Sequence, residues 1–444
     1  MARFFLQTLG CQMNKSDSQR IDSLLNSLGL TSTDKPQQAN LIIINTCSVR
    51  QSAEDRVFGF IHNWQELRKK QPKLIIAVTG CMPGRDKDGR IKERIKGVDL
   101  FFGIQDLIML PKWLRELNPD LLTERTDGEI LSDYLQIIPR TNNNFQAFVT
   151  IQTGCNNYCT YCVVPYARGL QRNRLIKDIL AEISHLVKIG VKDIMLLGQV
   201  VNNYQAPDKE NFSFDNPFKN QDDFSALLWE LNQIKGLERI NFTASDPQYF
   251  FDAQIEALKL PKQINYLHLP AQSGDNKILK KMNRKYSREQ YLELVKKIRQ
   301  ARPEIALGTD LIVGFCGETD RQFANTLDLY RQCDFDIAYP AMYSHRSGTA
   351  AAKAWPDDIS IRTKKERWWQ IQRLMEETTL IKNQKYARKK ISVLVESCKE
   401  GVCLGQSREM KLTQFLGAKE LIGQIVPIKV DKADRWILRG HIEK

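Results

Sequence analysis

The stretch Gly154-Cys155-Asn156-Asn157-Tyr158-Cys159-Thr160-Tyr161-Cys162 places three thiols within eight residues. Its spacing is C-x3-C-x2-C, and no cysteine or histidine follows within the next twenty residues. A structural zinc site closes its tetrahedron with four protein ligands, so this triad is one ligand short of such a site. A four-iron cluster held by three thiolates would keep one iron open to an external ligand. The stretch therefore predicts a cluster whose open iron does chemistry beside an organic cofactor.

The composition indicates a soluble protein of several domains. Its 444 residues can bury enough apolar area for two or three domains without disulfides. The chain begins with a strand-like stretch rather than a secretory signal, and its apolar runs fall far short of the roughly 20 residues that span a membrane. We therefore expect a cytoplasmic monomer with no membrane partner. Its ten cysteines should be cluster ligands or buried thiols rather than disulfides, because the cytosol keeps thiols reduced.

The chain is also strongly basic. Its 65 Lys and Arg residues exceed its 52 Asp and Glu residues and give a net charge of +13. Such a field attracts polyanions, so RNA or DNA is a natural partner. Charge alone leaves a merely solvated basic surface as an equal alternative.

The first 120 residues alternate short apolar runs with helical patterns. Strands are expected at 3–9, 40–45, 73–79 and 98–102, and helices at about 16–27, 52–70, 86–96 and 107–117. This alternation is typical of a parallel sheet with helices on both faces. Cys11, Cys47 and Cys81 each follow the end of a predicted strand. Because the carboxyl ends of parallel strands meet at one edge of a sheet, these three thiols should converge.

A connector and a second alternating series follow. Residues 121–144 contain Asp127-Gly128, Pro139 and three consecutive asparagines, with little periodic structure. Six further strands are expected at 145–152, 193–197, 239–243, 264–269, 306–313 and 336–342, with helical patterns between them. Six βα units suit a partial barrel rather than a complete eight-stranded one. The cysteine triad follows the first of these strands.

The last part of the chain predicts a small barrel. A charged helix over about 364–386 leads to short strands expected at 391–396, 403–406, 411–415, 424–430 and 436–439. Residues 384–444 carry 13 Lys and Arg against 7 Asp and Glu. Small basic barrels commonly hold nucleic acid, although a solvated surface remains the plain alternative.

The C-x3-C-x2-C triad on the first strand of a partial barrel resembles the radical S-adenosylmethionine superfamily. With the three N-terminal cysteines and the small barrel, the whole chain resembles the methylthiotransferases, which insert sulfur and a methyl group into unactivated C–H bonds. The resemblance implies an α/β protein with four segments. These are an N-terminal parallel α/β sandwich (1–120), a linker (121–144), a central partial (βα)6 barrel (145–383) and a C-terminal five-stranded TRAM-like β-barrel (384–444).

The resemblance also implies two [4Fe-4S] clusters and S-adenosylmethionine. Cys155, Cys159 and Cys162 would hold the cluster that binds and cleaves S-adenosylmethionine, giving a 5′-deoxyadenosyl radical. An auxiliary cluster that carries the sulfur to be transferred would be held by Cys11, Cys47 and Cys81. An electron-donor protein and a sulfur donor are further implied partners.

Three short motifs resemble the branch that methylthiolates N6-isopentenyladenosine next to the tRNA anticodon. They are GCQMN at 10–14, NTCSVR at 45–50 and CVVPY at 162–166, and they imply tRNA as a partner. The chain departs from the family at Ala167, where threonine is usual, at Asp246, where histidine is usual, and at Cys316, where proline is usual.

Three alternatives stay open. Alanine at position 167 also occurs in the branch that acts on threonylcarbamoyladenosine. A related enzyme methylthiolates a ribosomal protein side chain. A non-catalytic, RNA-binding iron-sulfur protein that senses redox state is the alternative from another class.

Further roles are carried over from the resemblance. Active sites lie at the ends of barrel strands, which assigns cofactor-binding roles to Tyr161, Gly198, Gln199, Ser245 and Gln272. RNA contacts are expected at Arg168 and Arg174 near the mouth and at Lys389, Lys390, Arg408 and Arg439 in the small barrel. The other cysteines, Cys316, Cys333, Cys398 and Cys403, fit neither triad and are expected to be structural thiols.

Overall fold

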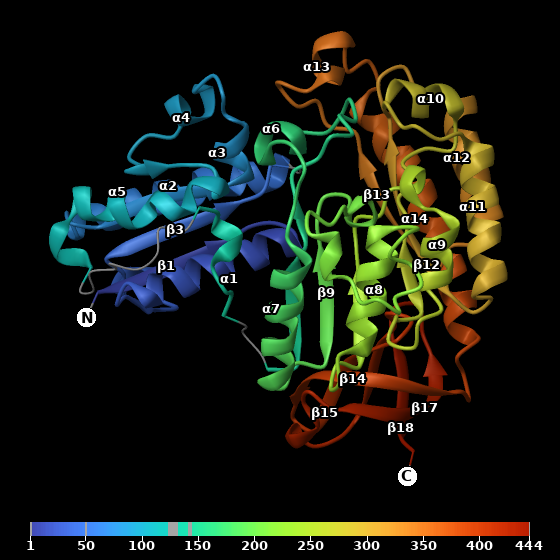
Figure 1. Ribbon diagram of the computed structural model, residues 1–444. Coiled ribbons are helices and arrows are strands. Elements are labelled where there is room, and N and C mark those ends of the chain that lie inside the picture. Colours follow the sequence, from blue (N-terminus) through green and yellow to red (C-terminus); the bar gives the residue numbers. More distant parts are fainter. Residues whose placement is uncertain (1, 49–50, 123–131, 141–143, 444) are drawn as a thin grey trace.

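The computed structural model describes residues 2–48, 51–122, 132–140 and 144–443 (Figure 1). Val49 and Arg50 of the second motif lie outside these residues, as do Asp127-Gly128 and most of the three-asparagine run of the connector. No helix within the described ranges has the length and apolarity that a membrane crossing requires.

The N-terminal segment folds as the expected parallel sheet. Its strands are β1 Arg3–Thr8, β2 Thr31–Ser32, β3 Leu41–Thr46, β4 Ile75–Gly80 and β5 Leu100–Phe101, in the order β2-β1-β3-β4-β5. Every neighbouring pair is parallel. The central strands β3 and β4 are buried along their whole length, which explains their unbroken apolar runs.

Helices cover both faces of this sheet (Figure 1). Successive residues of β3 point to opposite faces and join different apolar clusters. Ile43 clusters with residues of α1 (Gln12–Ser27) and α5 (Leu110–Leu117), and Ile44 clusters with residues of α2 (Gln51–Lys70). The prediction of a single helix at 86–96 is wrong. The chain instead forms α3 Cys81–Arg85 and α4 Arg90–Arg94. The break arises because the Asp86 carboxylate accepts hydrogen bonds from the backbone of α4 and Gly89 has a φ of 75°.

The central segment is a partial barrel of six parallel strands. They are β6 Gln146–Thr150, β9 Asp193–Leu197, β10 Arg239–Phe242, β11 Tyr266–His268, β12 Ala306–Val313 and β13 Ile337–Met342. The expected six βα units are confirmed, with one refinement: the strands form two three-stranded sheets. A single parallel bridge, Ile240 to Gln263, joins the two sheets between β10 and β11. The outer helices are α7 Ile176–Lys188, α8 Asp223–Gln233, α11 Arg288–Ala301, α12 Asp320–Cys333 and α14 Ile361–Gln384.

The C-terminal segment is the expected closed five-stranded barrel. Its strands are β14 Lys390–Lys399, β15 Val402–Ser407, β16 Leu412–Leu416, β17 Ile425–Ala433 and β18 Leu438–Ile442. It packs against the amino ends of the central strands, at the bottom of Figure 1. Arg239, the first residue of β10, donates from Nη1 to the Gln406 carbonyl at 2.8 Å and from Nη2 to the Ser392 carbonyl at 2.9 Å. The small barrel therefore lies at the end of the central barrel opposite the cysteines.

Two of the cysteines expected to be free thiols are paired. Cys398 and Cys403 stand directly opposite each other on β14 and β15 and form a disulfide, with their Cα atoms 4.0 Å apart. The expectation that these two cysteines stay reduced in the cytosol is corrected here, because the hairpin register brings their side chains into contact. Cys316 and Cys333 are buried free thiols, as expected.

Candidate active site

The three N-terminal cysteines converge at the carboxyl edge of the first sheet. Cys11 precedes α1 after β1, Cys47 directly follows β3, and Cys81 begins α3 after β4. Because β1, β3 and β4 are neighbours in the sheet, their ends lie side by side. Burial raises the pKa of the Cys81 thiol to about 11, Arg168 opposes the shift, and the Cys47 and Cys11 thiols add to it. Cys47 and Cys81 are buried and Cys11 is exposed.

Two asparagines of the sequence motifs hold these strand ends together. Asn14 donates from Nδ2 to Asn45 Oδ1 at 3.0 Å and to the Thr46 carbonyl at 3.1 Å. Asn45 donates back to the Asn14 carbonyl at 2.9 Å. The polar positions beside Cys11 and Cys47 therefore fix one thiol-bearing turn against the next.

The second triad lies in the loop that follows β6 and the short strand β7 (Gln152–Thr153). Gly154 opens this loop with a φ of 76°, and a Cβ atom there would lie 2.0 Å from the Leu170 carbonyl oxygen, so only glycine fits. The backbone amides of Asn157 and Val164 donate to the sulfurs of Cys155 and Cys162 at 3.5 and 3.4 Å.

Burial dominates the acidity of these thiols. It raises the pKa of Cys155 to about 11 and that of Cys162 to about 12, and the Cys159 thiol beside them adds to both shifts. The backbone donors act in the opposite direction because they stabilise the thiolate, the form that binds iron.

Neither triad is arranged for a single ion. In the described part of the chain, no three cysteine, histidine or carboxylate side chains can hold one metal ion together. A four-iron cluster needs thiolates that lie farther apart than the ligands of one ion, since each thiolate binds a different iron at a separate corner. Three converging sulfurs, with N–H donors aimed at them, fit such a cluster better than they fit zinc.

The loops after β9 and β10 (Arg239–Phe242) carry buried polar atoms without a hydrogen-bond partner in the described structure. Gly198 and Gln199 follow β9, and Ser245 follows β10. Gln199 Oε1 and Ser245 Oγ are buried without a hydrogen-bond partner among the described residues. Because a buried polar atom without a partner costs free energy, these two atoms indicate a ligand that would satisfy them.

The two remaining candidates for cofactor binding, Tyr161 and Gln272, differ in their surroundings. Burial raises the pKa of the Tyr161 hydroxyl well above its ordinary value, beside the Cys159 and Cys162 thiols. Gln272 has a φ of 65° and its backbone bridges to β12, with its N–H donating to the Asp310 carbonyl at 2.8 Å.

A buried ion pair that the sequence did not reveal supports the triad. Arg284 pairs with Asp246 at 3.0 Å and donates from Nη1 to the Cys159 sulfur at 3.4 Å. Asp246 also accepts a 2.8 Å hydrogen bond from Asn157. The aspartate at position 246, one of the departures from the family, therefore has a defined partner in this chain.

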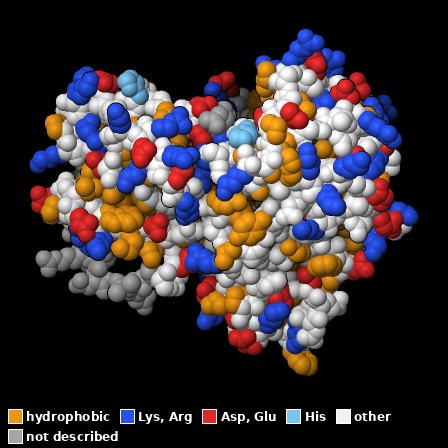
Figure 2. All heavy atoms as spheres, turned by 90° about the horizontal axis from the view of Figure 1, so that it is seen from above, with side chains coloured by type: hydrophobic (Ala, Val, Ile, Leu, Met, Phe, Trp, Pro, Cys, Tyr) orange, Lys and Arg blue, Asp and Glu red, His pale blue; other side chains and the backbone are white. Residues whose placement is uncertain are grey.

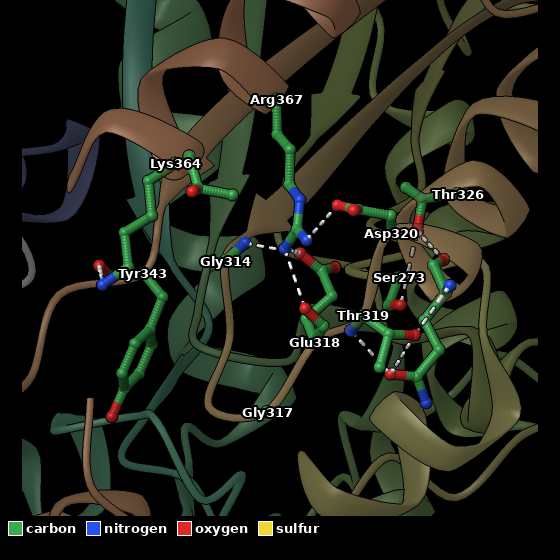
Figure 3. A network of polar contacts seen from close by, with 12 residues as sticks. Ser273, Gly314, Gly317, Glu318, Thr319, Asp320, Thr326, Tyr343, Lys364 and Arg367 are labelled. Atoms are coloured by element: carbon green, nitrogen blue, oxygen red, sulfur yellow. Dashed lines mark hydrogen bonds and ion pairs between the residues drawn. The ribbon is translucent and has the colours of Figure 1, made fainter. Parts of the chain in front are cut away.

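The loop after β12 is fixed by a separate network (Figure 3). Glu318 accepts at Oε2 from the Gly314 backbone at 2.7 Å and from Arg367 of α14 at 2.8 Å. Arg367 also pairs with Asp320 at 2.7 Å. Burial raises the pKa of the Glu318 carboxyl, although Gly314 and Arg367 oppose the shift. Cys316, another departure, is buried within this loop.

The two triads are linked by a pair of short helices. α3 begins at Cys81, and α6 (Val164–Arg168) begins two residues after Cys162. The helices touch: a Cβ atom added to Gly84 would lie 2.2 Å from the carbonyl oxygen of Ala167. Ala167, the first departure from the family, is 2% exposed and belongs to this contact.

Two expected RNA contacts are corrected by their burial. Arg168 is 2% exposed, pairs with Asp17 at 2.6 Å and donates from Nε to the Cys81 sulfur at 3.3 Å. Arg174 pairs with Glu182 at 2.7 Å and donates to the Thr150 carbonyl at 2.8 Å. Arg168 is held between the two α/β segments, and Arg174, with a side chain 10% exposed, is bonded within the central one, so neither presents an open surface to RNA.

The four candidates in the small barrel have different surroundings. Arg408 is partly exposed and donates to the carbonyls of Pro261 and Gln263, which ties the small barrel to the central one; its RNA contact stays a prediction. Lys389, Lys390 and Arg439 are exposed, as expected for a phosphate contact. Of these, Lys390 pairs with Glu443 at 3.0 Å and Arg439 with Asp434.

The opposite face of the molecule is also rich in basic side chains. Seen from the carboxyl ends of the strands, Lys and Arg side chains are spread over both lobes (Figure 2). A polyanion could therefore be attracted at the end of the molecule where the thiols lie.

Two family models match the chain. Residues 3–103 match the model described as "Uncharacterized protein family UPF0004", and residues 149–330 match the radical SAM superfamily. Among solved structures, the radical S-adenosylmethionine methyltransferase TsrM from Kitasatospora setae aligns with a TM-score of 0.54 over 79% of this chain and 77% of that one. At 13% identity this likeness shows the fold alone.

Curated relatives are similar over the whole chain. Proteins named tRNA-2-methylthio-N(6)-dimethylallyladenosine synthase from Anoxybacillus flavithermus and Bacillus subtilis are each 40% identical over 99% of this chain, covering 82% and 86% of their own lengths. The relative of that name from Clostridium botulinum is 40% identical over 99% of this chain and 97% of its own length. The chain therefore belongs to the family of tRNA-2-methylthio-N(6)-dimethylallyladenosine synthases, within the radical SAM superfamily.

Proposed function

We propose that the protein is a radical S-adenosylmethionine tRNA methylthiotransferase that places a methylthio group on C2 of N6-isopentenyladenosine next to the anticodon. The observation that carries this proposal is the pairing of two three-thiol sites across α3 and α6. A four-iron cluster held at either site would have three protein ligands, which would leave one iron open to an external ligand. Family membership supports the same substrate.

The cysteines would hold two [4Fe-4S] clusters. Cys155, Cys159 and Cys162, all free thiols, would hold the cluster that acts on S-adenosylmethionine, and the free thiols Cys11, Cys47 and Cys81 would hold the auxiliary one. When bound, these groups supply the electron transfer, the radical and the sulfur. The chain supplies thiols whose sulfurs are already approached by backbone N–H donors, which would stabilise the thiolate form that binds iron.

The polar loop residues would hold S-adenosylmethionine. Ser245 Oγ and Gln199 Oε1 are buried and unpartnered, so a ligand that offers amino and hydroxyl groups there would satisfy both. Gly198 allows the chain to pass close to Gln152, since an added Cβ would lie 3.2 Å from its side chain. Tyr161 and Gln272 complete the proposed lining of this site.

The tRNA would contact both ends of the molecule. The adenine must reach the thiol-bearing end, while Lys389, Lys390 and Arg439 would contact phosphates at the small barrel. In the cysteine loop, Tyr158 is 45% exposed, which gives an unpaired base an aromatic ring on which to stack. A cytoplasmic location, an electron-donor protein and a sulfur donor complete the proposal.

The test is anaerobic turnover on tRNA with and without the isopentenyl group. We expect mass spectrometry of the digested nucleosides to find the methylthio product only with isopentenylated tRNA. Activity on threonylcarbamoylated tRNA, or on a ribosomal protein instead of tRNA, would replace this proposal with one of the two enzymatic alternatives. Failure to release 5′-deoxyadenosine from S-adenosylmethionine under strong reductant would favour the redox sensor.

A further inference from the structure

Arg168 connects the two thiol sites. It is the last residue of α6, six positions after Cys162, yet its guanidinium reaches into the N-terminal segment. There Nε donates to the Cys81 sulfur at 3.3 Å and Nη2 pairs with Asp17 at 2.6 Å. Asp17 lies on α1, the helix that begins directly after Cys11. One side chain of the central barrel is thus in contact with the ligand set of the auxiliary site.

The third nitrogen of the same guanidinium has no partner in the described structure. Arg168 Nη1 is buried and makes no hydrogen bond with any described residue. A guanidinium is always charged and always a donor. A buried N–H group without an acceptor, beside three converging thiols, points to an acceptor at the auxiliary site itself.

A second buried arginine shows that this arrangement is specific. Arg174, six residues further along, has a side chain only 10% exposed and also pairs with an acid, Glu182, which in turn lies 3.8 Å from Arg20 of α1. It also donates to the Thr150 carbonyl, and within the described structure it makes no hydrogen bond to a cysteine. Burial and ion pairing alone therefore do not bring a guanidinium to a sulfur.

We propose that Arg168 is a positioning residue of the auxiliary cluster, which raises the reduction potential of that cluster and holds Cys81 toward the central barrel. This inference rests on the proposed two-cluster function. Reduction adds one electron and hence negative charge to a cluster, without forming or breaking a bond. A fixed cation that donates hydrogen bonds to the cluster sulfurs stabilises the reduced form and so raises the potential.

The test is a mediated redox titration with dithionite, followed by electron paramagnetic resonance. It uses the full chain with Cys155, Cys159 and Cys162 replaced by alanine, so that one cluster is observed. We expect Arg168→Gln to lower the potential by about 59 mV, which is a tenfold change in the one-electron reduction equilibrium. Arg168→Lys keeps the positive charge but lacks the planar guanidinium. Its reduction potential should therefore lie between those of the parent and Arg168→Gln. Arg174→Gln is the matched control and should leave the potential unchanged.

Each outcome decides the inference. An unchanged potential in both Arg168 variants, with iron content equal to that of the parent, overturns it. Equal shifts from Arg168→Gln and Arg174→Gln overturn it too, because they would reflect loss of buried charge in general. Absence of iron from the cysteine-to-alanine parent would instead refute the two-cluster function, and this inference with it. If Arg168→Gln does not fold, the lysine variant alone decides, since a shift toward lower potential is still required.

Discussion

Gly84→Ala should separate the two thiol sites without changing any ligand. Gly84 lies in α3 with an ordinary helical backbone, so only the space beside it forbids a side chain. The added Cβ would lie 2.2 Å from the Ala167 carbonyl oxygen of α6, whereas ordinary contact begins at 3.4 Å. The obstacle is backbone rather than a flexible side chain, so the helices must move apart by about 1 Å.

That displacement sets the expected size of the effect. A misplacement of about 1 Å between reacting groups can cost about 100-fold in rate. We therefore expect methylthio transfer to fall about 100-fold, while S-adenosylmethionine is still cleaved to 5′-deoxyadenosine because the loop carrying Cys155, Cys159 and Cys162 is intact. Overpacking of this kind should also cost about 1–3 kcal/mol of stability.

The assay is anaerobic turnover with isopentenylated tRNA, measuring methylthio nucleoside and 5′-deoxyadenosine in the same reactions. Gly59→Ala is the matched control, since a Cβ there meets nothing within 4 Å. Wild-type methylthio transfer by a Gly84→Ala protein with full iron content would refute the argument that contact between α3 and α6 sets the distance between the two sites.

Three further predictions concern other parts of the molecule. Burial raises the pKa of Asp193 from 3.8 to about 7. The folded state therefore binds more protons than the unfolded state between these pH values, and the free energy of unfolding falls as the pH rises through them. Asp193→Asn should remove about 2 kcal/mol of this fall between pH 5.5 and 8, as measured by urea unfolding. Ser245→Ala should weaken S-adenosylmethionine binding about fivefold, the value of one hydrogen bond, with unchanged iron content; equal affinity by calorimetry would remove Ser245 from the site. Lys389→Ala should weaken tRNA binding and reduce the slope of log affinity against log salt by about 0.9; an unaltered slope would exclude a phosphate contact at that lysine.

Local pattern was enough to predict the strands and the two triads. The central strands β3 and β4 of the first sheet are apolar runs buried on both faces, whereas the two-residue edge strand β2 was not expected. The cysteines come at the ends of β1, β3 and β4, where parallel topology brings them together. The position of each thiol is therefore set by the fold of the segment that carries it. In the small barrel, β14–β15, β15–β16 and β17–β18 pair as neighbours in the chain, whereas the parallel β16–β18 pair and the antiparallel β14–β17 pair close it.

Contacts between segments could not be predicted in this way. Arg168 was expected to contact RNA near the mouth of the barrel, whereas the packing of α6 against α3 places its guanidinium on Asp17. The disulfide between Cys398 and Cys403 depends on hairpin register, which a single residue of slippage would abolish. The pairing of Asp246 with Arg284 joins loops 38 residues apart in sequence and has no local signature.

The most direct test of the account is the amount of iron and acid-labile sulfide bound per chain after anaerobic reconstitution. Two four-iron clusters require about eight of each in the wild-type protein. Replacing Cys11, Cys47 and Cys81 with alanine, or Cys155, Cys159 and Cys162 with alanine, should leave about four in each variant. A reproducible value of about four in the wild-type protein, with all six cysteines intact, would contradict the two-cluster site on which the proposed function rests.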